Sequence, residues 1–217
     1  MQVEIIRENQ SGQRLDKYLK KLLPQAGTGF LYKMLRKKNI TLNGKKAEGS
    51  ELLRKGDEVK FFFSEETFLK FTGSQEQAEI KTKEYLKAYQ KLKGIEVLYE
   101  DAHILVLNKP AGILSQKAAP EDSSLNEWML GYLLQENPSL EKELSSFKPS
   151  VCNRLDINTS GIVLCGKSLP GLQYLSQCIK ERSVQKFYRT VCTGCLDKGE
   201  RISGYLKKDE EQNQGQN

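Results

Sequence analysis

The stretch VCNRLDINTSGIVLCGKS, residues 151–168, places an arginine and an aspartate between two runs of small apolar residues. Arg154-Leu155-Asp156 is followed by the turn-forming cluster Asn158-Thr159-Ser160-Gly161, and the chain then returns to the strand-like run Ile162-Val163-Leu164-Cys165. This order predicts two strands joined by a short polar loop. Two interpretations of the loop stay open: the aspartate either caps its own backbone in an ordinary turn or is a catalytic carboxylate.

The composition is typical of a globular protein. The 217 residues are 38% hydrophobic and 29% charged, which suits one large or two small domains. No apolar run approaches the roughly 20 residues that span a bilayer, and the charged N-terminus lacks the pattern of a signal peptide. Five cysteines between residues 152 and 195 fit reduced thiols better than a disulfide framework. We therefore expect a cytoplasmic protein that does not bind membranes.

The net charge of +6 is concentrated in the N-terminal quarter of the chain. Residues 7–60 hold 14 lysines and arginines against 6 aspartates and glutamates, whereas residues 61–217 hold 20 against 21. Such a concentration of positive charge is what binding to a phosphate backbone requires. A basic face that only keeps the protein soluble is the alternative.

Two amphipathic helices and a hairpin are predicted in this basic quarter. In residues 11–24, with Ser11 as a helix cap, apolar side chains recur every three or four residues up to Pro24. A second helix near residues 28–39 has an apolar face and a basic face. Asn43-Gly44 is a turn typical of tight hairpins, and Lys55-Gly56-Asp57 leads into a further strand.

Two basic helices followed by a small hairpin resemble the alpha-L RNA-binding module, which is shared with a ribosomal protein. The resemblance covers residues 12–62 and rests on Arg14-Leu15-Asp16, the helix end at residues 36–38, residues 40–44, and residues 55–57. It implies that the second helix and the hairpin contact RNA. The positions that would make these contacts are Lys33, Arg36, Lys37, Lys38, Lys45 and Lys46.

The rest of the chain predicts an α+β sheet domain, preceded by a linker. Residues 64–94 mix charge, glutamine and glycine and indicate a linker with some helix around residues 79–92. Residues 95–116 predict two strands and a bend at Pro110-Ala111-Gly112. Helices near residues 123–134 and 169–182 and a strand at KFYRTVCTG, residues 186–194, alternate irregularly with the loop that carries Asp156.

Three motifs in order resemble the RNA pseudouridine synthases of the Rlu type. They are Asn108-Lys109-Pro110-Ala111-Gly112, then Arg154-Leu155-Asp156 with Thr159-Ser160-Gly161, and then Lys186-Phe187-Tyr188. Many members of that family also carry an N-terminal alpha-L module. The resemblance implies an α+β chain with a small αα-β-hairpin RNA-binding module and a mixed, mainly antiparallel catalytic sheet of the pseudouridine synthase fold.

The resemblance implies that Asp156 is the catalytic carboxylate. Converting uridine to pseudouridine breaks the N-glycosidic bond and reattaches the base through carbon. The carboxylate would act either as the nucleophile at the sugar or as the base that removes a sugar proton. Arg154 would contact a phosphate of the flipped nucleotide or keep the carboxylate ionised. Alternatively, the two residues form an ordinary surface ion pair.

Tyr188 and the Asn108-Lys109-Pro110 motif also belong to the implied site. Tyr188 matches the active-site tyrosine of the family, whose ring packs against the target base, and a strand would turn it away from Phe187. Asn108, Lys109 and Pro110 are expected to place the start of the catalytic sheet, with Lys109 also touching the RNA backbone.

The chain departs from the family pattern at three places. Asn153 stands where many relatives have histidine before Arg-Leu-Asp, and Ile157 stands where a basic residue is frequent; both fit variation within a subgroup. The third departure is the end of the chain, because the family's catalytic domain continues past the tyrosine strand with further strands. We therefore expect an incomplete catalytic domain, truncated at its C-terminus.

The sequence thus predicts an alpha-L module in residues 1–63, a linker in residues 64–94 and part of a pseudouridine synthase domain in residues 95–217. The expected function is pseudouridine formation in structured RNA, with large-subunit ribosomal RNA favoured and transfer RNA open, by a monomer that needs no cofactor and no metal. Cys192 and Cys195 have the spacing of a zinc knuckle but lack a second pair, and His103 is the only histidine. The alternative function is RNA binding without turnover.

Overall fold

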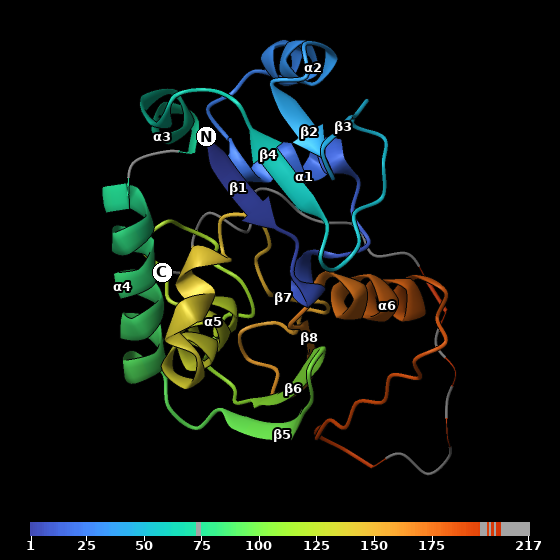
Figure 1. Ribbon diagram of the computed structural model, residues 1–217. Helices are drawn as coiled ribbons and strands as arrows, with labels where there is room; N and C mark the ends of the chain where they lie inside the picture. Colours follow the sequence, from blue (N-terminus) through green and yellow to red (C-terminus); the bar gives the residue numbers. More distant parts are fainter. Residues whose placement is uncertain (73–74, 196–198, 200, 202, 205–217) are drawn as a thin grey trace. The chain divides into compact units, whose positions relative to one another are not determined.

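The computed structural model describes residues 1–72, 75–195, 199, 201, 203 and 204 (Figure 1). The chain divides into a first unit, residues 1–184, and a second unit, residues 185–217. All described helices and strands lie in the first unit. None of the described helices is long and apolar enough to cross a membrane, and all five cysteines are unpaired.

The N-terminal sheet is antiparallel, with the strand order β1-β4-β2-β3. Its strands are β1 (Gln2–Ile5), β2 (Ile40–Leu42), β3 (Lys45–Lys46) and β4 (Glu58–Phe61). The predicted turn between β2 and β3 is confirmed, since Asn43 and Gly44 have φ angles of 51° and 72°. The Asn43 side chain also bonds to Asp57 and to the backbone of Glu58, which fastens the hairpin to β4.

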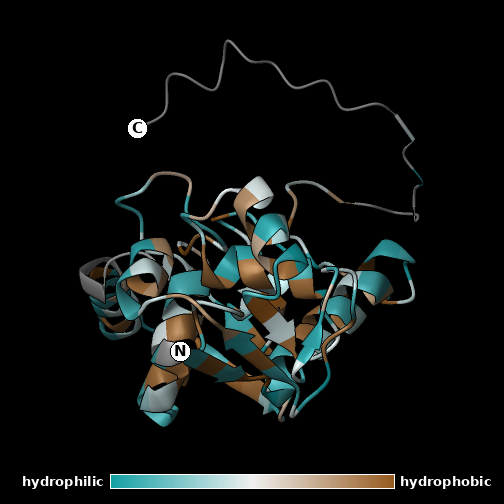
Figure 2. Ribbon diagram, turned by 45° about the horizontal axis from the view of Figure 1, so that its top comes forward, coloured by the Kyte–Doolittle hydropathy of each residue, from teal (hydrophilic) through white to brown (hydrophobic). Residues whose placement is uncertain are grey.

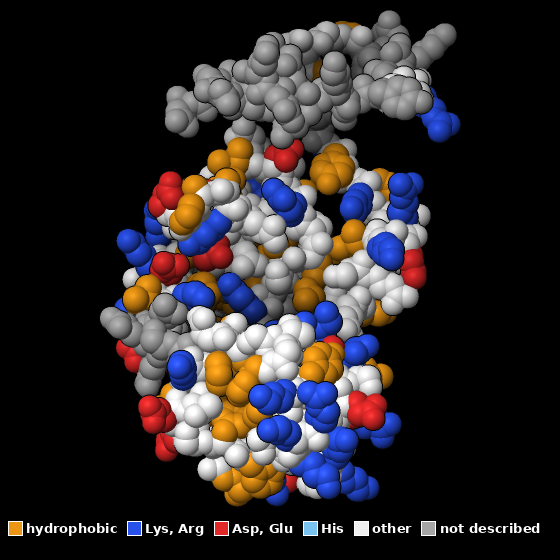
Figure 3. Space-filling model, turned by 90° about the horizontal axis from the view of Figure 1, so that it is seen from above, with side chains coloured by type: hydrophobic (Ala, Val, Ile, Leu, Met, Phe, Trp, Pro, Cys, Tyr) orange, Lys and Arg blue, Asp and Glu red, His pale blue; other side chains and the backbone are white. Residues whose placement is uncertain are grey.

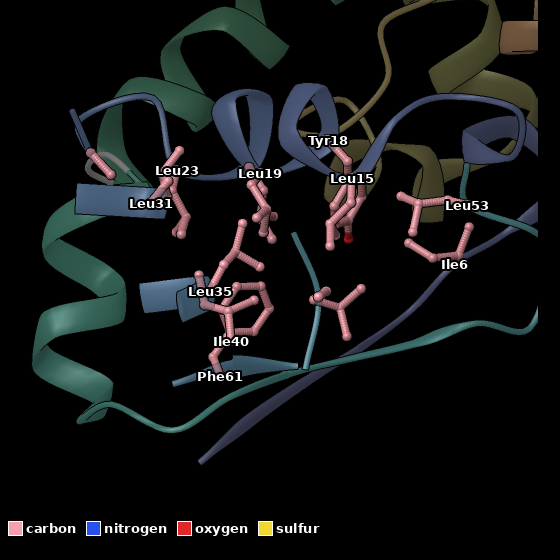
Figure 4. Packing of buried hydrophobic residues seen from close by; sticks show 14 of the residues in the cluster. Ile6, Leu15, Tyr18, Leu19, Leu23, Leu31, Leu35, Ile40, Leu53 and Phe61 are labelled. Atoms are coloured by element: carbon pink, nitrogen blue, oxygen red, sulfur yellow. The ribbon is translucent and has the colours of Figure 1, made fainter. Parts of the chain in front are cut away.

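Helices α1 (Leu15–Leu22) and α2 (Thr28–Arg36) cover this sheet, and a short 3-10 turn, η1 (Glu8–Gln10), precedes them. Figure 4 shows Leu15, Tyr18 and Leu19 of α1 pointing toward Ile40 and Phe61 of the sheet. The predicted helices are therefore confirmed. The first one starts at Leu15 rather than after Ser11, because the backbone of residues 12–15 forms hydrogen bonds with Glu51 and Leu53.

The segment predicted as a linker forms two helices, α3 (Glu65–Thr72) and α4 (Gln75–Lys91). Phe68 of α3 packs 5.1 Å from Phe61, and Phe71 packs 4.6 Å from Phe30, measured between ring centroids. Helix α4 lies beside α5 (Leu125–Glu136), as Figure 1 shows. The segment is thus packed at both ends, while the predicted three-part division of the chain stays a prediction.

The second sheet is also antiparallel, with the strand order β5-β6-β8-β7. It comprises β5 (Glu96–Glu100), β6 (Ile104–Lys109), β7 (Ser150–Val151) and β8 (Gly161–Gly166), accompanied by η2 (Pro138–Lys142) and α6 (Leu169–Lys180). Its pairing, together with the helices, confirms the predicted α+β class. Figure 2 shows hydrophobic (brown) and hydrophilic (teal) residues interspersed along the helices and strands.

Alternate residues of β6 and β8 build the second core. Leu105 and Leu107 of β6 and Val163 and Cys165 of β8 are fully buried, as are the inward residues of α5. Strands β6 and β8 pair over six residues, from Ile104 opposite Gly166 to Lys109 opposite Gly161. This register brings the end of β6 beside the start of β8, where the Asp156 loop ends.

The predicted strand at residues 186–194 is wrong. The structure assigns neither helix nor strand to residues 185–195, and the side chains of Phe187 and Val191 are 84% and 100% exposed. An isolated strand is not stable without a partner for its backbone groups. No residue of the described chain pairs with this segment, so its strand-like sequence alone does not make it a strand.

The contact between α4 and α5 depends on Gly131. A Cβ atom at this position would lie 2.2 Å from the backbone oxygen of Tyr85 and 2.7 Å from Cβ of Tyr89. We expect Gly131→Ala to lower the free energy of unfolding by about 1–3 kcal/mol, because the helices must separate. Chemical denaturation followed by the fluorescence of Trp128, which lies in the same core, measures this change.

The control is Gly29→Ala in α2, where an added Cβ meets nothing within 4 Å. It should leave stability unchanged or raise it by up to about 1 kcal/mol through the higher helix propensity of alanine, as far-ultraviolet circular dichroism can show. Equal stability of Gly131→Ala and the parent chain would contradict the close helix contact.

Candidate active-site loop and basic surface

At the start of the loop between β7 and β8, the side chain of Asn153 forms two hydrogen bonds with the backbone of β8. The Asn153 Oδ1 atom accepts a hydrogen bond of 2.7 Å from the Leu164 backbone, and its Nδ2 atom donates one of 3.1 Å to the Ile162 oxygen. The amide therefore continues the β7–β8 ladder for one more step. The asparagine that stands in place of the family's histidine thus has a structural role here.

Leu155 anchors the middle of the loop in the second core. Its side chain is 9% exposed and belongs to the cluster beneath the sheet, whereas Arg154 and Asp156 on either side of it are exposed. In extended backbone, successive side chains point to opposite sides. Burial of the leucine therefore directs the charged side chains of Arg154 and Asp156 toward solvent.

The segment after β6 holds the loop from the other side. The Ser115 hydroxyl donates to the Leu155 oxygen at 2.7 Å and accepts from the Leu155 nitrogen at 2.9 Å. The Gly112 nitrogen donates to the Ile157 oxygen at 2.7 Å. Gly112 has a φ angle of 86°, which favours glycine at this bend. Both neighbours of Asp156 are therefore tied to residues 112–115.

Lys109 also belongs to this attachment. Its side chain is 0% exposed, and its ammonium donates to the carbonyl oxygens of Ile113 (2.7 Å), Pro110 (3.1 Å) and Ile157 (3.4 Å). Burial lowers the pKa of Lys109, and the negative charge of Asp156 opposes that shift. The predicted contact of Lys109 with the RNA backbone is contradicted by this burial, because no part of the ammonium faces solvent.

Arg154 and Asp156 do not form the surface ion pair that the sequence left open. Among the described residues, no hydrogen bond or ion pair joins these two side chains or gives either of them another partner. The Asp156 backbone oxygen accepts a hydrogen bond of 3.0 Å from Thr159, which closes the turn. The loop therefore presents one carboxylate and one guanidinium that are both available to a ligand.

Tyr188, the third residue predicted for the site, lies in the second unit of the chain. Its side chain is 67% exposed. Its predicted role under the target base stays a prediction.

The six predicted RNA-binding cations lie on α2, just after α2 and on β3. All six side chains are exposed, and within the described part of the chain none forms an ion pair: Lys33, Arg36, Lys37, Lys38, Lys45 and Lys46. Figure 3 shows Lys and Arg side chains gathered beside hydrophobic ones on the face it displays. A surface hollow of about 310 Å³ between α2 and the hairpin is lined by Tyr32, Leu35, Arg36, Lys46, Ala47 and Glu48. We call the six exposed cations Lys33, Arg36, Lys37, Lys38, Lys45 and Lys46 the basic surface.

The other motif residues take ordinary positions. His103 Nδ1 lies 2.8 Å from the Ser168 hydroxyl at the start of α6, where it helps to cap the helix. Cys192 and Cys195 are exposed. Within the described ranges, no three His, Cys, Asp or Glu side chains are grouped so that they could hold a metal ion.

Ser115 is a residue of this site that was not predicted from the sequence. Its signal is a serine directly after the apolar pair Ile113-Leu114, in a segment that the fold buries. Serine is mostly exposed in proteins, so a serine that is 3% exposed requires hydrogen-bond partners inside the protein. The identity of those partners depends on the β6–β8 register and not on the local sequence.

Comparison with known proteins gives the loop its context. The family model for RNA pseudouridylate synthase matches residues 103–217. "Ribosomal large subunit pseudouridine synthase C" of Rickettsia felis is 34% identical over 183 residues, which cover 83% of this chain and 55% of the relative. The protein of the same name from Rickettsia bellii is 35% identical over 86% of this chain and 58% of the relative, and that from Vibrio vulnificus is 29% identical over 89% and 56%.

The chain therefore spans between half and two thirds of the length of these curated relatives. A solved structure, "Human RNA Pseudouridylate Synthase Domain Containing 4", matches 51% of this chain and 36% of that chain at 18% identity, with a TM-score of 0.29, which is too low to compare folds. The family match covers more than half of the chain and contains the Asp156 loop. The chain belongs to the RNA pseudouridylate synthase family.

Proposed function

We propose that this chain converts uridine to pseudouridine in structured RNA, with Asp156 as the catalytic carboxylate. The observation that carries this proposal is the exposed, unpaired Asp156 on a loop whose backbone is tied on both sides, inside the region matched by the family model. The names of the relatives make large-subunit ribosomal RNA the first candidate substrate. Transfer RNA is the second.

The chemistry needs a carboxylate that can reach the sugar of the target nucleotide. Asp156 would act as the nucleophile at the sugar or as the base that removes a sugar proton. In either role it must be ionised and accessible, and no cation of the described residues covers it. Because the isomerisation involves no net oxidation or reduction, we expect no cofactor.

Arg154 and Tyr188 would complete the site. The Arg154 guanidinium is exposed on the same loop and suits a phosphate of the flipped nucleotide. The ring of Tyr188 would stack on the target base, as aromatic side chains do with unstacked bases.

The basic surface would provide most of the affinity for RNA. Six exposed cations without protein partners can displace counterions from phosphates, and that term dominates sequence-independent binding. Helix α2 and the hairpin carry these cations, and together with α1 they support an alpha-L module in residues 1–63. We further propose a monomeric protein of the cytoplasm, where ribosomal RNA is modified.

RNA binding without turnover is the second candidate function. It is favoured by residues 185–195, which carry Tyr188 but form no strand in the structure. In that case the basic surface would keep its role and Asp156 would have none.

Reversing the charge of Lys37 and Lys38 tests the basic surface. The double variant Lys37→Glu with Lys38→Glu should bind a ribosomal RNA fragment more weakly at low salt. The slope of log K against log salt concentration should also become flatter by about two, about one for each lost phosphate contact. Filter binding or fluorescence anisotropy over a salt series measures both effects.

The matched control is Lys83→Glu with Lys87→Glu on α4. Both lysines are exposed, and the change in net charge is the same. Equal losses in the two double variants would mean that total charge, and not the basic surface, drives binding.

Replacing Asp156 with asparagine tests the catalytic role. Asp156→Asn keeps the size of the side chain and should bind RNA as the parent does. Its rate of pseudouridine formation on a large-subunit ribosomal RNA transcript should fall by about a thousandfold or more, because the reacting carboxylate is lost. Mass-spectrometric nucleoside analysis measures the product.

The parent chain is the reference for this assay. Product from the parent and none from the variant supports the enzyme. Turnover by Asp156→Asn close to that of the parent removes Asp156 from the catalytic role, and a parent that binds RNA without forming product supports the second candidate function.

A further inference from the structure

A single hydroxyl group satisfies both backbone groups of the residue before Asp156. The Ser115 Oγ atom donates to the Leu155 oxygen at 2.7 Å and accepts from the Leu155 nitrogen at 2.9 Å. Ser115 is 3% exposed and Leu155 is 9% exposed, so water does not compete for these groups. Among the described residues, the Leu155 backbone has no other hydrogen-bond partner.

This contact differs from the other attachments of the loop. Gly112 and Lys109 both hold the Ile157 oxygen, so either contact can partly replace the other. The Lys109 ammonium is also engaged by the oxygens of Ile113 and Pro110. Between Asn153 and Asp156, the two bonds to Ser115 are the only hydrogen bonds of the backbone among the described residues.

Resting on the function proposed above, we infer that Ser115 is a positioning residue that fixes the Asp156 carboxylate for the reaction. It does so by holding the peptide groups on both sides of the Leu155 Cα, the second of which leads directly into Asp156. Among the described residues, no other hydrogen bond restrains that peptide group. The hydroxyl touches neither the carboxylate nor any position that RNA could occupy, because it is buried.

Loss of the hydroxyl would loosen the loop without unfolding the sheet. Ser115→Ala leaves the Leu155 N–H and C=O groups buried and without partners, and the loop must shift to find water for them. A catalytic group must stay within about 0.5 Å of its productive position. A shift of about 1 Å can cost a factor of about a hundred in rate.

The test compares Ser115→Ala with a matched buried serine, Ser168. Ser168 is 2% exposed, accepts a hydrogen bond of 3.2 Å from the Gly171 nitrogen and lies 2.8 Å from His103 Nδ1, so its hydroxyl also has two partners. It caps α6, and among the described residues no hydrogen bond joins it to residues 152–160. For the full 217-residue chain and both variants, kcat and KM on a ribosomal RNA transcript, Tm, and amide hydrogen exchange at Leu155 are measured.

We expect Ser115→Ala to lower kcat by about ten- to a hundredfold while KM for RNA stays within about twofold of the parent. Ser115→Ala and Ser168→Ala should lower Tm by similar amounts, because each removes one buried hydroxyl with two partners. Ser168→Ala should leave kcat unchanged. If Ser115→Ala does not fold, Ser115→Cys is used in its place, since the thiol occupies the position of the hydroxyl, although sulfur is larger, and is a weak donor and acceptor. Ser115→Cys should also lower kcat. A kcat for the folded Ser115 variant equal to that of Ser168→Ala would overturn the inference.

Amide exchange separates this inference from the proposed function. If the parent chain forms no pseudouridine, the proposed function fails. Exchange at Leu155 then decides whether Ser115 fixes the loop: at least tenfold faster exchange in the Ser115 variant, with unchanged exchange in α6, supports the positioning contact. Unchanged exchange at Leu155 overturns it whether or not the parent is active.

Discussion

The structure around Asp156 depends on one constraint: a short exposed loop must find hydrogen-bond partners for its backbone. Residues 109–115, which begin with the last residue of β6, supply these partners through the Ser115 hydroxyl, the Gly112 nitrogen and the Lys109 ammonium. These residues lie about 40 positions earlier in the chain. The six-residue pairing of β6 with β8 brings them to the loop, so the sheet register sets the place of the carboxylate.

Lys109 shows what this arrangement costs and how the cost is offset. It occupies an inward position of β6, two residues after Leu107, where alternation would normally place an apolar side chain. Removing its ammonium from water is unfavourable, and burial accordingly lowers its pKa. Three carbonyl oxygens and the field of Asp156 compensate. Lys109, which belongs to the Asn108-Lys109-Pro110-Ala111-Gly112 motif, therefore connects β6 to the loop inside the protein.

The sequence predicted those parts of the fold that depend on local pattern. Helical spacing located α1 and α2, and Asn43-Gly44 located the hairpin, because these signals act within a few residues. The strand predicted at residues 186–194 failed because a strand depends on a partner that local sequence does not specify. The site divides in the same way: the Arg154-Leu155-Asp156 loop could be found from its residues, whereas the burial of Lys109 and the contact of Ser115 depend on distant carbonyls.

Under the proposed function, a negatively charged catalytic group must work beside the phosphates of RNA. Repulsion between Asp156 and a phosphate is reduced by positive charge close to both, and Arg154 is the exposed cation of the same loop. The phosphate contacts of the basic surface would supply affinity and orientation, whereas Arg154 lies on the loop of the carboxylate itself. Since Arg154 and Asp156 are not paired with each other, the guanidinium remains free to meet a phosphate while the carboxylate remains free to react. The buried Leu155 between them keeps both charges in solvent. Because no ion pair joins them, two opposite charges two positions apart in the chain can serve different groups of one nucleotide.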